Sequence, residues 1–145
     1  MQYTDMFSLE THDGDETSIS YRIAGDGPPL LLLHGFPQTN MMWHKIAPAL
    51  AERYTVVAAD LRGYGDSGHP ASDAAHAPYS KRAMAADMAG LMRGLGHHSF
   101  MVAGHDRGGR VAHRLARDHG DCVTRIAVLD IAPTAAMYGQ TAVSY

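Results

Sequence analysis

Short apolar runs recur along the chain, and each is bounded by glycine, proline or polar residues. These runs are Leu30–Leu33, Thr55–Ala59, Ser99–Ala103 and Ile126–Leu129. An uninterrupted apolar run of this length is typical of a strand that is buried on both faces of a sheet. We therefore predict a buried strand at each of these positions.

Apolar and polar residues alternate in two segments that precede these runs. The segments Phe7–Thr11 and Ile19–Ile23 flank the Asp- and Gly-containing stretch His12–Asp15. Alternation of this kind indicates half-buried strands, and a short turn-forming link between two of them favours a β-hairpin. We expect a hairpin near the N-terminus.

Apolar residues at helical spacing lie between the predicted strands. A first helical face consists of Trp43, Ile46, Ala47 and Leu50. A second helix is predicted to follow the N-cap residue Ser80 and to stop at Gly96. Its apolar stripe consists of Met84, Met88, Leu91, Met92 and Leu95. We interpret this methionine-rich stripe as core rather than as a binding surface, because that spacing is typical of a buried helix face.

A third helix is expected from Arg107 to His119, with its end at Gly120. Strands that alternate with helices imply a parallel sheet joined by crossover helices. The predicted fold class is therefore α/β.

The composition fits one globular domain and argues against several classes of protein. The chain has 145 residues, is 46% hydrophobic and carries a net charge of −3. Its basic residues do not cluster, so no nucleic-acid partner is expected. The longest apolar run, Pro28–Leu33, is too short for a membrane span, and the N-terminus does not have the layout of a signal peptide. The single cysteine, Cys122, excludes an intramolecular disulfide, and we expect a cytoplasmic protein.

The segment Gly63–Gly68 matches two motifs that the surrounding sequence argues against. A dinucleotide-binding G-x-G-x-x-G loop needs a helix that begins within the motif, whereas Pro70 follows here and helical spacing returns only near Ser80. The acidic residue at the expected distance, Asp87, lies in the middle of a predicted helix. The tetrapeptide Gly65–Gly68 is similar to the nucleophile segment of chymotrypsin-like proteases, which are all-β. We interpret the segment as a tight loop after a strand.

The strongest candidate for a catalytic residue is Asp106, within the segment Val102–Gly109. This segment joins a predicted strand directly to a predicted helix, with small residues two positions before and two positions after Asp106. The pattern is that of the nucleophile elbow G-x-S-x-G, with aspartate in place of serine. The alternative is a helix N-cap, but an N-cap does not need glycine on both sides.

An aspartate at an elbow predicts a different reaction from that of a serine. A carboxylate is already ionised near neutral pH, and the helix N-terminus, Arg107 and Arg110 favour the anion further. A carboxylate attacks a saturated carbon and forms an alkyl ester, which water then hydrolyses, normally with a histidine as base. The expected substrates contain a carbon–halogen bond or an epoxide.

The segment His34–Pro37 follows the strand Leu30–Leu33 and is the candidate oxyanion loop. Its position suits an oxyanion hole formed by the backbone amides of Phe36 and Arg107. The alternative is a plain turn at the end of a strand.

These segments together resemble the α/β-hydrolase superfamily and, within it, the fluoroacetate (haloacetate) dehalogenases. The resemblance runs through His34–Gln38, Ala59–Ser67, Gly104–Arg110 and Val128–Thr134. The first two motifs are shared with epoxide hydrolases and haloalkane dehalogenases. The third is more specific, because those relatives usually have a tryptophan at the position of Arg107. The resemblance implies an α/β-hydrolase fold with a mostly parallel sheet and an N-terminal β-hairpin, and residues 1–145 would be the N-terminal part of its core domain.

The resemblance also implies roles for particular residues. Arg107 and Arg110 would bind the carboxylate of a small haloacid, which agrees with the preference of guanidinium groups for carboxylates. Asp130 would be the acid that orients the catalytic histidine, and His105 would have a supporting role. The alternatives are a surface charge for Arg110 and a turn-forming aspartate for Asp130. Because the remaining histidines lack carboxylate or thiol neighbours at metal-ligand spacing, we expect no metal and no other cofactor.

The expected catalytic histidine follows the acid in this superfamily, yet no histidine follows Asp130 in the sequence. The resemblance further implies a lid and two more strands beyond the matched region. We therefore expect a truncated chain in which Ile126–Leu129 is an uncovered apolar edge. The hypotheses at this point are a haloacetate dehalogenase acting on a haloacid and water, an epoxide hydrolase, and a non-catalytic fragment that folds or pairs with a partner. The resemblance also points to a homodimer.

Overall fold

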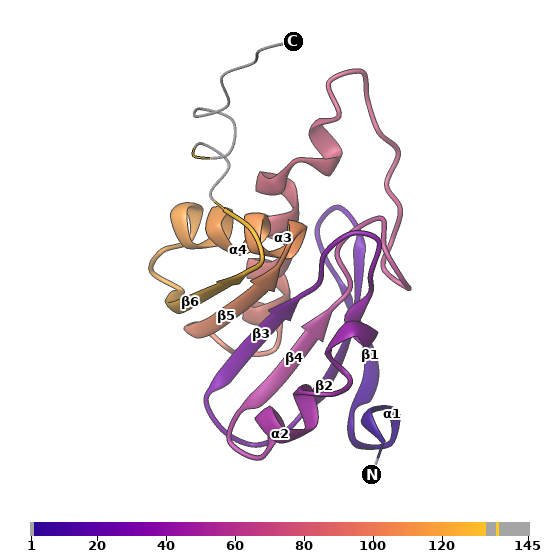
Figure 1. Ribbon diagram of the computed structural model, residues 1–145. Coiled ribbons are helices and arrows are strands. Elements are labelled where there is room, and N and C mark those ends of the chain that lie inside the picture. Colours follow the sequence, from indigo (N-terminus) through magenta and orange to yellow (C-terminus); the bar gives the residue numbers. More distant parts are fainter. Residues whose placement is uncertain (1, 133–135, 137–145) are drawn as a thin grey trace.

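Among the residues that the structure describes, six strands form a single sheet in the order β1-β2-β4-β3-β5-β6 (Figure 1). The computed structural model describes residues 2–132 and residue 136. The strands are β1 (Ser8–Asp13), β2 (Ser18–Ala24), β3 (Pro29–Leu33), β4 (Thr55–Ala59), β5 (Phe100–His105) and β6 (Val123–Leu129). All four strands expected from apolar runs are therefore present, and β4 has the predicted bounds.

The sheet is antiparallel at one end and parallel over the rest. Strands β1 and β2 form the expected hairpin, and the Gly14 amide donates to the Thr17 carbonyl at 3.1 Å in its turn. Strand β2 pairs with β4 in the antiparallel sense, whereas β4, β3, β5 and β6 run parallel. The carboxyl ends of these parallel strands lie at one edge, which is where α/β folds place their ligand sites.

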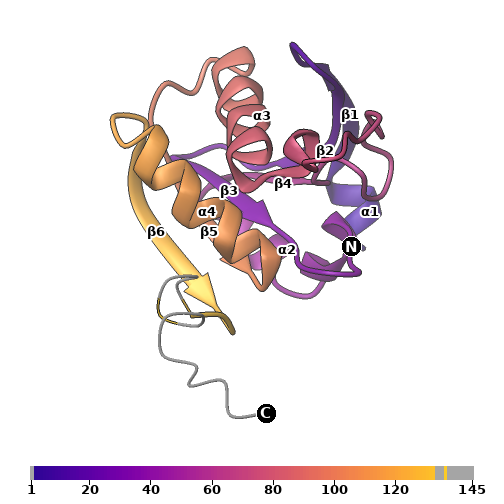
Figure 2. The same cartoon turned by 90° about the horizontal axis from the view of Figure 1, so that it is seen from above.

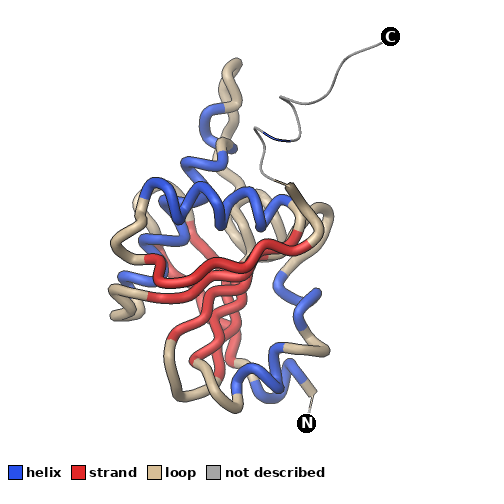
Figure 3. The backbone as a smooth tube through the Cα atoms, turned by 60° about the vertical axis from the view of Figure 1, so that its left-hand side comes forward, coloured by secondary structure: helices blue, strands red, loops and turns tan. Residues whose placement is uncertain are grey.

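Helices cover both faces of the sheet, as Figures 2 and 3 show. The helical segments are α1 (Tyr3–Met6), η1 (Asn40–Trp43), α2 (Ala47–Ala51), η2 (Ala77–Tyr79), α3 (Lys81–Gly94) and α4 (Arg107–Asp118), of which η1 and η2 are 3₁₀ turns. Helices α3 and α4 pack against each other and close one core with Leu31, Leu33 and Val57. Segments α1, η1 and α2 close a second core with Leu32 and Val56. Successive residues of β3 thus enter opposite cores, which explains its continuous apolar run.

Helix α3 confirms the interpretation of the methionine-rich stripe. The Ser80 hydroxyl accepts a hydrogen bond from the Ala83 amide at 3.1 Å, so Ser80 is the N-cap. Met84, Met88 and Met92 are at most 5% exposed. The stripe is core.

The stretch predicted as one helix around Trp43 is divided in two. Trp43 lies in η1 and Ala47 begins α2, and both are buried as expected. Ile46 is 48% exposed, so its assignment to the buried face was wrong. A continuous helix from Trp43 would need a backbone N–H at Pro48 to bond to the preceding turn, and proline has none.

Strand β6 occupies the edge of the sheet rather than its interior. Ile126, Val128 and Leu129 are each 42% exposed, so the prediction of burial on both faces was wrong for this strand. The apolar edge that the resemblance implied is present.

Among the described residues, no helix has both the length and the apolar character needed to cross a membrane.

Candidate active site

Asp106 occupies a sharp turn between strand and helix. Strand β5 ends at His105 and α4 begins at Arg107, so a single residue reverses the chain direction. The Asp106 backbone has φ 51° and ψ −118°, a region that costs a residue with a β-carbon about 1–3 kcal/mol. Its side chain makes no hydrogen bond that caps α4. The N-cap alternative is therefore excluded, and the carboxylate is free to serve another purpose.

The glycines around Asp106 are required by close backbone contacts. A β-carbon at Gly104 would lie 2.2 Å from the Gly108 carbonyl oxygen, and one at Gly108 would lie 2.3 Å from the Leu33 carbonyl oxygen. Such separations are far below van der Waals contact, so neither position accepts a side chain without movement of the backbone. The small residues expected on both sides of Asp106 thus let α4 begin directly against β3 and β5.

The Asp106 carboxylate lies at the predicted oxyanion loop. The Phe36 amide donates to Asp106 Oδ2 at 3.0 Å. This hydrogen bond is the main cause of a lowered pKa for Asp106, and the backbone amide of Arg107 and the charges of His105 and Arg107 lower it further, against partial burial. Both amides named from the sequence therefore act on this carboxylate and hold it ionised.

A buried histidine fixes the loop that carries Phe36. His34 Nδ1 donates to the Gly35 carbonyl at 2.8 Å, and its Nε2 accepts the Leu61 amide at 3.0 Å. Burial lowers the pKa of His34, so the ring is neutral with its proton on Nδ1. The sequence placed His34 in the loop without revealing this role, and its position directly after an apolar strand was the only available signal.

Arg107 and Arg110 both emerge from the first turn of α4. The Arg107 guanidinium carbon lies 4.6 Å from the centre of the Phe36 ring, and its Nη1 donates to the Tyr64 hydroxyl at 3.1 Å. Arg110 is half-buried, and its amide donates to the Asp106 carbonyl at 3.3 Å. The structure thus brings Phe36, Asp106 and Arg107 together, with Arg110 one helical turn away.

Asp130 lies beside this group, directly after β6. The Asp106 amide donates to the Leu129 carbonyl at 3.1 Å, which links the two turns. Asp130 has φ 52° and a carboxylate that is 91% exposed, with Oδ2 3.8 Å from His105 Nε2. His105 Nδ1 is in turn 3.3 Å from Gln38 Oε1. Pro133 and Thr134, the last residues of the motif that contains Asp130, lie outside the described residues.

Comparison with known proteins agrees with this architecture. Residues 28–145 match the family model described as the alpha/beta hydrolase fold. The chain belongs to the α/β-hydrolase family. It is 56% identical to a fluoroacetate dehalogenase from Burkholderia sp., over 91% of this chain and 43% of that protein. It is 47% identical to a soluble epoxide hydrolase from Corynebacterium sp. (strain C12), over 78% of this chain and 38% of that protein.

A solved structure shows how closely the core follows the family. The crystal structure of an α/β hydrolase from Nostoc sp. PCC 7120 superposes with a TM-score of 0.91 at 58% identity, over 93% of this chain and 46% of that one. The present chain therefore spans less than half the length of these α/β hydrolases.

The loop Gly63–Gly68 is structural in this α/β hydrolase. No helix begins within it, since α3 starts only at Lys81, so the dinucleotide-binding alternative is excluded. Ser67 is buried, and its hydroxyl donates to the Asp60 carbonyl at 2.6 Å while accepting the Ser20 amide at 2.9 Å. A serine bound in this way is not a nucleophile.

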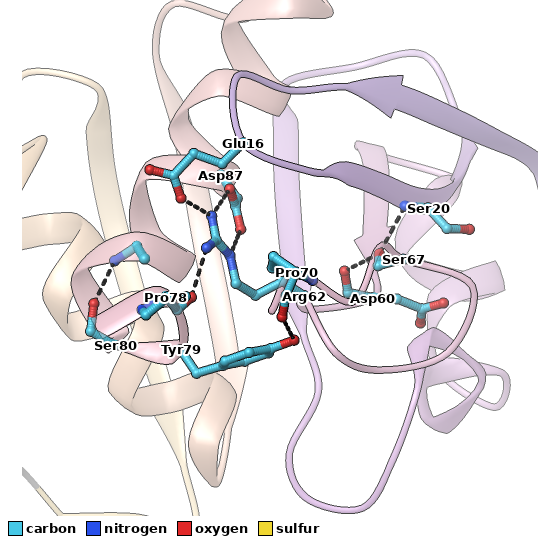
Figure 4. A network of polar contacts seen from close by, with 11 residues as sticks. Glu16, Ser20, Asp60, Arg62, Ser67, Pro70, Pro78, Tyr79, Ser80 and Asp87 are labelled. Carbon is cyan, nitrogen blue, oxygen red and sulfur yellow. Dashed lines mark hydrogen bonds and ion pairs between the residues drawn. The ribbon is translucent and has the colours of Figure 1, made fainter. Parts of the chain in front are cut away.

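An ion pair that the sequence did not reveal supports the same loop (Figure 4). Arg62 is 1% exposed and forms two 2.6 Å hydrogen bonds to the Asp87 carboxylate of α3. It also donates to the Pro78 carbonyl at 2.6 Å and lies 3.0 Å from the exposed Glu16 carboxylate. These contacts of Arg62 join the loop after β4 to α3 through Asp87 and to the hairpin turn through Glu16. Within the described part of the chain, no group of three or more His, Cys, Asp or Glu side chains is arranged to hold a metal ion.

Proposed function

We propose that the protein is a hydrolase that cleaves the carbon–halogen bond of a small haloacid through an alkyl-ester intermediate on Asp106. The observation that carries the proposal is an ionised aspartate at a strained strand–helix turn, with one oxygen bound by a backbone amide and an arginine next to it. The 56% identity to a fluoroacetate dehalogenase supports the same substrate class.

The first step is a displacement at carbon. The Phe36 amide holds Oδ2 of Asp106, which leaves Oδ1 to attack the carbon that bears the halogen. A bond forms between Oδ1 and this carbon, and the halide leaves with the electron pair of the carbon–halogen bond. Because the pKa of Asp106 is lowered, the nucleophile is already ionised and needs no base.

The arginines select the substrate in this proposal. A haloacetate carries its carboxylate one bond from the reacting carbon, so a guanidinium that binds it must lie beside the nucleophile. Arg107 directly follows Asp106, and Arg110 lies one turn further along α4. Guanidinium groups bind carboxylates through paired, charge-assisted hydrogen bonds, which also fix the orientation of the substrate.

The second step hydrolyses the ester and regenerates the Asp106 carboxylate. Water adds to the carboxyl carbon of the ester, negative charge develops on Oδ2, and the Phe36 and Arg107 amides stabilise that charge. The hydroxy acid then departs and Asp106 is restored. The family resemblance implies that a histidine oriented by Asp130 accepts the proton of this water. No histidine follows Asp130 in these 145 residues.

Substitution of the proposed nucleophile tests this function. In the full-length gene product, Asp106→Asn should lower halide release from fluoroacetate about 10⁴-fold or more, because no ester forms. Asp118→Asn, at the far end of the same helix, is the matched control and should retain activity. Turnover of Asp106→Asn at the unaltered rate would exclude the proposal.

Epoxide hydrolysis is the second candidate, and the 47% identity to a soluble epoxide hydrolase favours it. Both reactions use the same nucleophile, but an epoxide needs a proton donor for its oxygen and no carboxylate-binding arginine. Comparison of a neutral epoxide with fluoroacetate as substrates separates the two, since the proposal requires preference for the anion.

The 145 residues alone should react once. We expect a carboxymethyl ester on Asp106 that persists, and negligible sustained release of halide. Peptide mapping by mass spectrometry after exposure to fluoroacetate would locate the ester. Sustained turnover by this chain would contradict the expectation.

A further inference from the structure

Two aromatic side chains hold the guanidinium of Arg107. Its Nη1 donates to the Tyr64 hydroxyl at 3.1 Å, and its Cζ lies 4.6 Å from the Phe36 ring centre. The Phe36 and Tyr64 rings meet edge to face, with centroids 6.4 Å apart and planes at 81°. An exposed arginine, which would otherwise sample many rotamers, is thus held by side chains from two different loops.

Tyr64 is itself fixed by buried groups. Its ring lies 5.1 Å from the His34 ring at 66°, and His34 is completely buried with both ring nitrogens hydrogen-bonded. On either side, Gly63 and Gly65 have φ of 82° and 52°. A β-carbon at Gly65 would lie 2.2 Å from Asp60 Oδ2, so the loop passes directly over a buried carboxylate. The position of the Tyr64 hydroxyl is therefore set by the core.

We propose that Tyr64 is a positioning residue that makes this site selective for small carboxylates by holding Arg107 beside Asp106, with the Phe36 ring as a second support. The inference rests on the proposed function, in which Arg107 binds the substrate carboxylate. Arginine has no acceptor, so the Tyr64 oxygen must accept the hydrogen bond. A guanidinium ordered before the substrate arrives loses less conformational entropy on binding, and this increases affinity for the anion.

Removal of one hydroxyl tests the proposal. In the full-length gene product, Tyr64→Phe should raise the Kd of acetate, a carboxylate without a leaving group, by about 5- to 30-fold. The KM for fluoroacetate should rise by a similar factor, while kcat changes by less than about threefold, because the nucleophile is untouched. The matched control is Tyr79→Phe, which removes a hydroxyl that donates to the Pro70 carbonyl at 2.5 Å, and it should leave both constants unchanged. An unchanged Kd for acetate in folded Tyr64→Phe would overturn the proposal.

A double-mutant cycle separates positioning from a general structural effect. In an Arg107→Met background, Tyr64→Phe should not weaken acetate binding further, because its effect acts through the missing guanidinium. Additive effects would overturn the proposal. If Arg107→Met alone leaves acetate binding unchanged, the proposed function is wrong in assigning the substrate carboxylate to Arg107. If it weakens binding while Tyr64→Phe does not, only the role of Tyr64 is wrong.

The second support offers an independent test, should Tyr64→Phe fold poorly. Phe36 is 58% exposed, and Phe36→Leu retains the backbone amide that binds Asp106. We expect Phe36→Leu to weaken acetate binding severalfold through loss of the ring beneath the guanidinium. Unchanged acetate binding in this variant would contradict the proposed support.

Discussion

A single methyl group added at Gly35 should disable the site without unfolding the protein. A β-carbon at Gly35 would lie 2.6 Å from Asp106 Cβ and 2.9 Å from Asp106 Oδ2. Ordinary van der Waals contact begins at 3.4 Å, so the two segments must separate by roughly 0.8 Å. The hydrogen bond from the Phe36 amide to Oδ2, now 3.0 Å, would then lengthen beyond useful range.

The expected loss of activity follows from the role of this hydrogen bond in stabilising negative charge on Oδ2. Loss of one donor to a developing oxyanion typically lowers kcat about 10²- to 10³-fold, and we expect Gly35→Ala to fall in this range. The pKa of Asp106 should also rise, because the Phe36 amide is the main group that lowers it. Activity requires ionised Asp106 and is lost as the pH falls through this pKa, so the acid limb of the pH–rate profile should move to higher pH.

Steady-state kinetics across pH on the full-length gene product would measure both effects. The matched control is Gly90→Ala, because a β-carbon at Gly90 meets nothing within 4 Å. Since Gly90 lies inside α3, that change should raise stability by about 0.5–1 kcal/mol and leave kcat unchanged. If folded Gly35→Ala retained the kcat and acid limb of the unaltered protein, the argument from close contact would be refuted.

Further predictions concern stability and association. Asp87→Ala should lower the free energy of unfolding by about 3–5 kcal/mol, because it leaves Arg62 buried without its main partner. Glu16→Gln, at an exposed position, should lower it by less than about 1 kcal/mol, and chemical denaturation would measure both changes. Because burial lowers the pKa of His34, unfolding takes up a proton at this residue, and stability should fall as the pH drops below about 6.5. His34→Gln should reduce that pH dependence, and an unaltered slope would contradict the assignment. Val128→Lys should reduce concentration-dependent association of the 145-residue chain in light scattering, since Val128 is 42% exposed on the edge strand.

Most of the parallel sheet could be predicted because each inner strand has a strong local signal. The run Thr55–Ala59 is apolar throughout and forms β4 with the same bounds, and Asp106 lies at the expected strand–helix turn. Strand β6 shows the limit of this reasoning. The run Ile126–Leu129 is apolar like the inner strands, so its composition alone predicted burial on both faces. The uncovered edge was expected only from the resemblance to a longer family.

Contacts between residues far apart in the chain were not predictable from spacing. Arg62 and Asp87 are buried together, yet a charged residue in a loop and another in a helix ordinarily indicate exposed positions. The contact of Tyr64 with Arg107 likewise depends on how the loop after β4 meets the first turn of α4. The break in the helix near Trp43 differs from these cases, because Pro48 was a signal within the sequence itself.

The central claim is that Asp106 forms a covalent ester with the substrate, and the fate of oxygen atoms tests it most directly. The full-length gene product, in excess over fluoroacetate, would complete one turnover in water labelled with heavy oxygen. Hydrolysis at the carboxyl carbon predicts that the label enters the Asp106 carboxylate, found by peptide mapping, while the first hydroxy acid released is unlabelled. A labelled hydroxy acid together with unlabelled Asp106 would show that water attacks the substrate directly, and would contradict the account.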